Sequence, residues 1–152
     1  MKKILMIAGA LWLSVQTQAQ EVNKTFTGIS KIKMNTASGS CRIVKGTGSE
    51  VNVKLTYTYD KDTYKPVLEQ EGTTLILKEE FEGRNHSGSS KWTLTLPDNI
   101  DLNFNTGSGD LDVSDVAITM KSNTGSGNID LQKITGNVKI NTGSGNITLQ
   151  NH

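Results

Sequence analysis

The chain has 152 residues, of which 34% are hydrophobic, 20% charged and 5% aromatic, a composition that suits one globular domain once an export signal is removed. Sixteen Lys and Arg residues against fifteen Asp and Glu give a charge of +1, so no positive surplus is available for a nucleic-acid backbone. One cysteine excludes an intrachain disulfide, and two histidines leave little material for a Cys/His metal cluster. The composition therefore argues against a nucleic-acid-binding protein and offers little for catalysis.

Residues 1–19 have the order of a bacterial signal peptide. Lys2 and Lys3 form a positive n-region, residues 4–15 form an apolar h-region, and Thr17-Gln18-Ala19 supplies small residues at the cleavage point. Cleavage after Ala19 removes two lysines, which leaves 14 basic against 15 acidic residues and a charge of −1. The apolar run is too short to span a bilayer comfortably, and no second apolar run follows. We therefore expect an exported protein without a stable membrane span, located in the periplasm, at the cell surface or outside the cell.

Three nearly identical segments that open with Asn-Thr-Gly-Ser-Gly recur at a constant spacing. They begin at Asn105, Asn123 and Asn141. A degenerate fourth copy begins at Asn35 and places Cys41 where Ile129 falls in a later copy. Repetition at a fixed period indicates a repeat architecture.

Inside each 18-residue unit, apolar pairs two residues apart recur every nine residues. The spacing places both side chains of a pair on one face of a strand, and the residues between pairs are turn formers. The pairs are Leu102/Phe104, Leu111/Val113, Met120 with Ser122, Ile129/Leu131, Val138/Ile140 and Ile147/Leu149. Two corner types alternate: Thr-Gly-Ser-Gly at 106–109, 124–127 and 142–145, and a different turn at 115–118 and 133–136.

Stacking of successive coils as parallel strands about 4.8 Å apart brings Leu111, Ile129 and Ile147 into register as an interior column. We therefore predict an all-β, β-helix-like solenoid with 18-residue coils over residues 101–152. By its alignment, Cys41 should face this interior as a reduced, unreactive thiol. An exposed thiol for intermolecular pairing is the alternative.

Residues 20–100 form a less regular first half of the same domain, which spans residues 20–152. Alternating apolar residues predict strands at 51–59, 73–78 and 92–96, the last ending at Pro97. We expect these strands to form wider coils or hairpins that cover one end of the solenoid. Two loops, 60–71 and 80–91, separate them, and the second offers three residues for specific contacts. These are Phe81, Arg84 and His86. A disordered connection is favoured over a binding role for that loop.

The corner glycines suit tight turns that require a positive φ or close backbone approach. A phosphate-binding loop is disfavoured because a strand pattern, not a helix, follows each Thr-Gly-Ser-Gly. The repeated asparagines predict either a stacked amide ladder or exposed turn residues, and both remain open.

Calcium-binding β-rolls share the nine-residue period. In this chain Leu111 occupies the place of the ligand aspartate, so the ligand column is apolar. Asp112 and Asp130 would stack outward and could share a cation, but Thr148 ends the series. Solvated carboxylates are favoured over a hard-cation site, which needs six to eight oxygens.

Three features together resemble the bacterial putative adhesin family of exported, β-helix-like (toastrack-like) domains, related to the head domain of autotransporter adhesins. They are the segment Phe26-Thr-Gly-Ile-Ser-Lys-Ile-Lys, the Leu96-Pro97 step and the repeated Thr-x-Ser-Gly-Asp/Asn-Ile units. The resemblance covers roughly residues 24–149. It implies a right-handed, mostly parallel β-solenoid outside the cytoplasm, with a role in adhesion or envelope-associated protein interaction. It supplies no catalytic residues.

One departure is that the chain stops directly after a perfect repeat, without a divergent capping coil. A C-terminally truncated fragment and an open last edge both fit this feature. With an open edge, Ile147 and Leu149 should be exposed, and we expect end-to-end self-association or fraying of the last coil.

The sequence favours a non-catalytic binding module that displays a rigid polar surface to a protein or glycan of the envelope or of a host surface. An envelope stress-sensing or structural component is an alternative. A polysaccharide lyase or hydrolase is less favoured, because only Arg42 and Arg84 could neutralise a uronate, and no acid pair accompanies either in the repeat register. No catalytic, cofactor-binding or metal-binding residues are assigned.

Overall fold

The computed structural model describes residues 19–84 and 87–151, in which all regular secondary structure is β-strand. The predicted signal peptide lies outside these residues apart from Ala19, so its assignment stays a prediction. The strands are β1 (Gln20–Phe26), β2 (Lys31–Thr36), β3 (Ser40–Lys45), β4 (Val51–Tyr57), β5 (Tyr64–Glu71), β6 (Thr74–Phe81), β7 (Ser90–Leu96), β8 (Ile100–Thr106), β9 (Leu111–Ser114), β10 (Ile118–Thr124), β11 (Ile129–Gln132), β12 (Val138–Thr142) and β13 (Ile147–Gln150).

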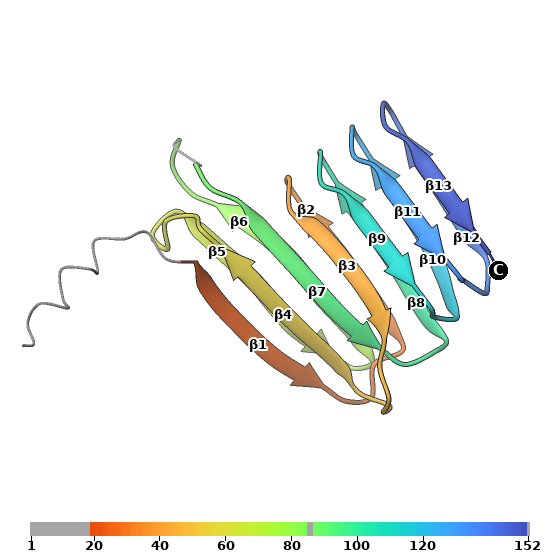
Figure 1. Cartoon of the computed structure of the whole chain (residues 1–152). Coiled ribbons are helices and arrows are strands. Elements are labelled where there is room, and N and C mark those ends of the chain that lie inside the picture. Colours follow the sequence, from red (N-terminus) through yellow and green to blue (C-terminus); the bar gives the residue numbers. More distant parts are fainter. Residues whose placement is uncertain (1–18, 85–86, 152) are drawn as a thin grey trace, which may run out of the picture.

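The strands form two sheets, as Figure 1 shows. Sheet A has the order β1-β4-β7-β3-β9-β11-β13, and sheet B has the order β12-β10-β8-β2-β6-β5. Pairing is parallel from β7 to β13 in sheet A and from β6 to β12 in sheet B. Antiparallel pairing is confined to β1–β4, β4–β7 and β5–β6. The predicted all-β, mostly parallel architecture is confirmed.

Equivalent residues of successive repeats lie side by side. Ile129 pairs with Leu111 on one side and with Ile147 on the other. Cys41 pairs with Leu111, which confirms that the degenerate copy takes its place in the same column. The spacing of the repeats therefore sets the register of sheet A.

The spatial order of the coils differs from their order along the chain. β3 lies between β7 and β9, and β2 lies between β6 and β8. The chain therefore leaves the stack after β3, builds the far end with β4 to β7, and returns with β8 beside β2. Antiparallel β1, β4 and β5 occupy that end, where β5 and β6 form a hairpin and β4 pairs with the non-consecutive strands β1 and β7.

The predicted loop over residues 60–71 is wrong for its second part, because β5 occupies Tyr64–Glu71 and pairs antiparallel with β6. Tyr64 and Leu68 are buried on its inward side, but the residues between them, Lys65, Pro66 and Val67, do not alternate in polarity and concealed the strand pattern. Pro66 is compatible with β5 because β5 is an edge strand, where a missing N–H leaves no ladder bond unmade.

The predicted loop over residues 80–91 is shorter than expected. β6 extends through Phe81 and β7 begins at Ser90, so strand residues occupy both ends of the predicted segment. Phe81 packs edge-on against the ring of Tyr59. Arg84 is exposed on the connection, and His86 lies outside the described residues.

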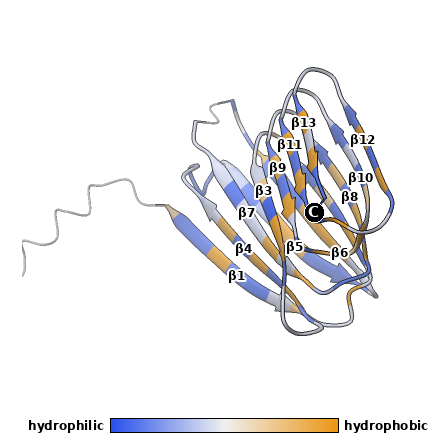
Figure 2. Cartoon of the chain, turned by 45° about the vertical axis from the view of Figure 1, so that its right-hand side comes forward, coloured by the Kyte–Doolittle hydropathy of each residue, from blue (hydrophilic) through white to orange (hydrophobic). Residues whose placement is uncertain are grey.

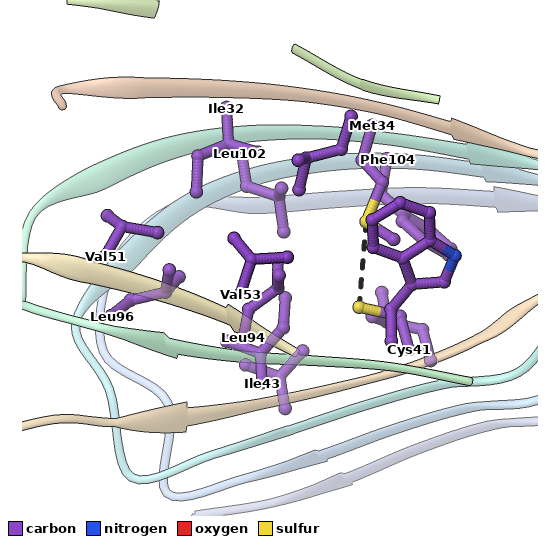
Figure 3. Close-up of a cluster of buried hydrophobic side chains, with 14 of the residues drawn as sticks. Ile32, Met34, Cys41, Ile43, Val51, Val53, Leu94, Leu96, Leu102 and Phe104 are labelled. Atoms are coloured by element: carbon purple, nitrogen blue, oxygen red, sulfur yellow. Dashed lines mark hydrogen bonds between the residues drawn. The ribbon is translucent and has the colours of Figure 1, made fainter. Parts of the chain in front are cut away.

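The core lies between the sheets. Hydrophobic and hydrophilic residues alternate along many of the strands (Figure 2). Figure 3 shows side chains of both sheets pointing toward one another. Trp92 has no exposed surface and stands in register between Leu55 and Cys41. Burial of an apolar side chain of this class contributes about 1.5–3 kcal/mol, so the columns supply the main folding energy.

Cys41 faces this core, as predicted. Only 2% of its surface is exposed, and its thiol donates to the sulfur of Met34 at 3.7 Å (Figure 3). Burial raises the pKa of the Cys41 thiol far above its ordinary value, so the nucleophilic thiolate is scarce.

The Thr-Gly-Ser-Gly corners require glycine because successive corners touch. A Cβ atom on Gly127 would overlap the carbonyl oxygen of Gly109, and Gly145 meets Gly127 in the same way. A positive φ is not the reason, since in the described residues the positive-φ glycines lie elsewhere. Left-handed backbone occurs instead at the alternate corners, at Asp115, Lys133 and Gly136.

The last coil leaves one end of the core uncovered. Val138, Ile147 and Leu149 are 36%, 48% and 61% exposed. A hollow of about 360 Å³ lies among these side chains and those of Leu131 and Ile134. The predicted exposure of Ile147 and Leu149 is confirmed, whereas self-association stays a prediction.

We predict that Gly127→Val lowers the unfolding free energy by about 3 kcal/mol or more, because its branched side chain must displace backbone of the preceding corner. Ser126→Ala, beside it and exposed, should cost no more than about 0.5 kcal/mol. Denaturant unfolding of both variants measures the difference. Equal shifts would show that the corner is not tightly stacked.

We predict that a maleimide reagent labels Cys41 in the folded chain far more slowly than in denaturant, because the thiol is buried and protonated. Mass spectrometry over a time course follows the reaction. Labelling at the unfolded rate would mean that the thiol is accessible and available for intermolecular pairing.

For the 152-residue chain we predict either end-to-end association or faster amide exchange in residues 138–150 than in residues 120–131, because the final coil has a neighbour on one side only. Sedimentation and native-state hydrogen exchange test the two parts together. A strictly monomeric protein whose final coil exchanges as slowly as residues 120–131 contradicts the open-edge account.

Candidate binding surface

The outward side chains of β2, β8, β10 and β12 form a continuous polar surface, called outer face B below. It arises because side chains alternate along a strand, so each apolar residue in the core leaves its neighbour outside. The residues are Lys31, Lys33, Asn35, Asp101, Asn103, Asn105, Thr119, Lys121, Asn123, Lys139 and Asn141. Every one of them is polar.

An asparagine ladder runs across this face, perpendicular to the strands. Each side-chain amide Nδ2 donates to the Oδ1 of the asparagine on the neighbouring strand. The bonds are Asn105 to Asn35 at 3.0 Å, Asn123 to Asn105 at 2.8 Å and Asn141 to Asn123 at 3.0 Å. Of the two alternatives for the repeated asparagines, the stacked ladder is therefore correct, and it lies on the outside.

A row of threonines lies beneath the ladder on the inward side. Thr36, Thr106 and Thr124 are buried, and each directly follows a ladder asparagine. The hydroxyl of Thr36 donates to that of Thr106 at 2.8 Å, and the amide of Gly109 donates to Thr106 Oγ1 at 3.0 Å. The hydroxyls of Thr36 and Thr106 thus tie the first two corners to the strands before them, whereas the buried hydroxyl of Thr124 has no hydrogen-bond partner.

The ladder stands between two shallow grooves. One, of about 600 Å³, follows the corner side of the ladder across all four strands, with threonines and the first corner glycines as its lining. The other, of about 210 Å³, lies between the ladder and Lys33, Asn103 and Lys121. Both grooves are open and run along the solenoid axis, so the face is shaped for an extended molecule.

A lysine row lies beside the second groove. Lys33, Asn103, Lys121 and Lys139 occupy the same register position on β2, β8, β10 and β12. Four lysines against one aspartate, Asp101, give outer face B a net charge of +3. The face is basic although the chain as a whole is nearly neutral.

The opposite surface, formed by the outward residues of β3, β9, β11 and β13, is weakly acidic. Asp112 stands in register between Arg42 and Asp130, and Thr148 follows. The pair suggested as a shared cation site therefore has an arginine beside it. Within residues 19–84 and 87–151 no group of three or more His, Cys, Asp and Glu residues is placed to hold a metal ion.

The two arginines considered for a polysaccharide-cleaving site lie on different elements. Arg42 is on β3, beside a hollow of about 340 Å³ that Lys91, Asp110 and Asp112 also line. Arg84 lies on the connection after β6. Asp110 Oδ1 accepts the backbone N–H of Asn128 at 2.8 Å, which gives that carboxylate a structural task at the corner.

Sequence reasoning missed one half-buried carboxylate, Glu79. Its oxygens accept hydrogen bonds from the hydroxyl of Tyr64 at 2.7 Å, the hydroxyl of Ser90 at 2.6 Å and the amide of Ala37 at 3.2 Å. Burial and then the neighbouring carboxylate raise the pKa of Tyr64, so it stays a donor. With three donors satisfied, Glu79 joins β5, β6 and β7 to the corner after β2 and acts as a structural residue.

Comparison with known proteins agrees with this geometry. The family model described as Toastrack DUF4097 matches residues 29–152. No curated protein is significantly similar to the chain. In the described residues no helix is long and apolar enough to cross a membrane.

Solved bacterial structures are similar to the chain at low sequence identity. A "putative cell adhesion protein" from Clostridium sporogenes is 14% identical with a TM-score of 0.50, and the match covers 89% of this chain and 100% of that one. A "putative adhesin" from Parabacteroides distasonis is 12% identical with a TM-score of 0.43, covering 88% and 65%. A "putative lipid binding protein" from the same species is 10% identical with a TM-score of 0.38, covering 89% and 97%.

We predict that Asn123→Ala lowers the unfolding free energy by about 0.5–1.5 kcal/mol, because it removes two ladder hydrogen bonds at a site where water replaces part of the loss. Asn103→Ala, one register row away from the ladder on β8, is the matched control and should cost less. Chemical unfolding of the two variants measures the difference. A larger cost at Asn103 would show that the ladder adds no stability.

Proposed function

We propose that the chain, which belongs to the Toastrack DUF4097 family, is an exported, non-catalytic binding module that presents a rigid polar surface in the bacterial cell envelope. The observation that carries the proposal is outer face B, where eleven polar side chains are held in register by the stacked coils. A surface whose polar groups keep fixed spacings can bind a partner without first ordering itself.

Rigidity is the property that favours binding over a passive structural role. The asparagines are tied to one another, and the threonines beneath them are buried. Binding to such a surface requires little additional side-chain ordering, which otherwise costs about 0.5–1.5 kcal/mol for each immobilised side chain. The name of the similar Clostridium sporogenes structure, "putative cell adhesion protein", points in the same direction.

The non-catalytic part of the proposal is supported by the carboxylates. Glu79 is occupied by three donors inside the fold, and Asp110 caps a corner. Asp112 lies in register between Arg42 and Asp130, which gives one of the two carboxylates a cationic neighbour. This is a poor arrangement for general acid and base catalysis, which needs two groups with opposed pKa shifts facing one substrate.

Export and coil geometry complete the proposal. Residues 1–19 act as the signal peptide, so the mature chain begins at Gln20 and resides in the periplasm, at the cell surface or outside the cell. The 18-residue coils are right-handed, because crossovers between parallel strands strongly prefer that hand. The pairing of Leu111, Ile129 and Ile147 supports that coil length.

Secretion of the full chain from a bacterial host, followed by N-terminal sequencing and a binding assay, tests the proposal. The mature chain should begin at Gln20 and bind saturably to isolated bacterial envelopes or to members of a glycan array, without releasing oligosaccharides. An uncleaved cytoplasmic product, or no saturable binding to any envelope fraction, glycan or envelope protein, contradicts it. Release of oligosaccharides would establish an enzyme instead.

A further inference from the structure

The lysines of outer face B are spaced as a row rather than scattered. Lys33, Lys121 and Lys139 share one register position, with Asn103 between the first two. At a strand spacing of about 4.8 Å, the row extends about 14 Å along the solenoid axis. A partner that satisfies all three lysines must therefore carry negative charge repeatedly along its length.

The asparagine ladder retains hydrogen-bonding capacity toward solvent. A side-chain amide has two N–H donors and two acceptor lone pairs. Asn105 and Asn123 each spend one donor and one acceptor on the ladder, which leaves one of each per residue. This repeating pair of one donor and one acceptor matches hydroxyl groups, which donate and accept at the same atom.

The two rows are parallel and lie on either side of the same groove. The hollow of about 210 Å³ is lined by Lys33 and Lys121 on one side and by Asn35, Asn105 and Asn123 on the other. An extended ligand molecule lying in this groove would therefore contact positive charge along one side and amide groups along the other.

We propose that outer face B binds an acidic polysaccharide lying along the solenoid axis, with its acidic groups toward Lys33, Lys121 and Lys139 and its hydroxyl groups toward the asparagine ladder. This inference rests on the proposed binding function and names its ligand class. The polysaccharide crosses β2, β8, β10 and β12 at right angles, so each repeat contributes one amide and each lysine one charge.

The surface chemistry favours this ligand over an anionic membrane or a nucleic acid. Outer face B presents no apolar side chain that could enter the acyl region of a bilayer. It also presents no aromatic side chain on which a base could stack.

The experiment measures binding of the exported chain to immobilised polygalacturonate and heparin, with dextran as the neutral polymer and phosphatidylglycerol vesicles as the membrane probe. The face variant carries Lys33→Gln, Lys121→Gln and Lys139→Gln. The control variant carries Lys24→Gln, Lys54→Gln and Lys91→Gln, exposed residues of sheet A, so both variants have the same net charge. All six positions are exposed, and thermal unfolding verifies that both variants fold.

We expect the native chain and the control variant to bind at least one of the two acidic polymers with affinities within about twofold of each other. The face variant should bind about tenfold more weakly, because the binding free energies of three modest, exposed charge contacts are lost together. Asn123→Ala should weaken binding further by a few fold, with little change in the salt dependence, because it removes a neutral contact.

Three results would overturn the inference. Equal weakening in both lysine variants would mean attraction by overall charge, and binding to vesicles but to neither polymer would mean a membrane ligand. Binding to neither acidic polymer, while saturable binding to envelopes persists, would also overturn the ligand assignment and leave the proposed function intact. Loss of all envelope binding by the native chain would instead remove the proposed function.

Discussion

Each Thr-Gly-Ser-Gly corner lies against the backbone of the corner before it, and the rest of the structure depends on that contact. The second glycine of the corner faces the carbonyl oxygen of its counterpart in the preceding corner, where a side chain would not fit. The corner amides add hydrogen bonds between coils, from Gly125 to Thr106 at 3.1 Å and from Ser126 to Gly107 at 3.1 Å. Together these contacts hold successive coils at strand spacing with no offset.

Zero offset has consequences on both sides of each strand. Inside, it aligns Leu111, Ile129 and Ile147 as a column and places buried threonines at three successive corners, those of Thr36, Thr106 and Thr124. Outside, it brings the amides of successive asparagines within hydrogen-bonding distance of one another, which forms the ladder. A slip of one residue would exchange these two sets, because side chains alternate across a strand. The same stacking therefore specifies the core and the polar surface.

The structure of the repeats was predictable because the repeated sequence itself indicates how successive strands align. Identical residues at equivalent positions of successive repeats indicate which positions meet, and the alignment of Cys41 with Ile129 correctly placed the thiol inside. The family and the all-β class followed from the same residues. The ladder and exposed turn asparagines both stayed open because the sequence does not show where each strand ends. Once β8 is seen to extend to Thr106, alternation places Asn105 outward, directly after the inward Phe104.

The first half was harder to predict because its contacts are not periodic. β5 was missed since Tyr64 and Leu68 are separated by Lys65, Pro66 and Val67, which do not alternate in polarity. Glu79 lies in a run of charged residues, which suggested an exposed position. It is nevertheless two residues after Leu77 and four after Leu75, a spacing that places all three side chains on the inward face of β6. The return of β8 to the edge of β2 joins segments that are distant in the sequence, and local patterns carry no information on such a pairing.

Hydrogen-bond scalar couplings across the coils, measured on the labelled mature chain by long-range HNCO spectroscopy, test the central claim most directly. The account predicts couplings from the amide of Leu111 to the carbonyl of Asn128 and from the amide of Ile129 to the carbonyl of Asn146, bonds of 2.9 and 2.8 Å. Couplings that connect these amides to residues in any other register, or to an antiparallel partner, would contradict it.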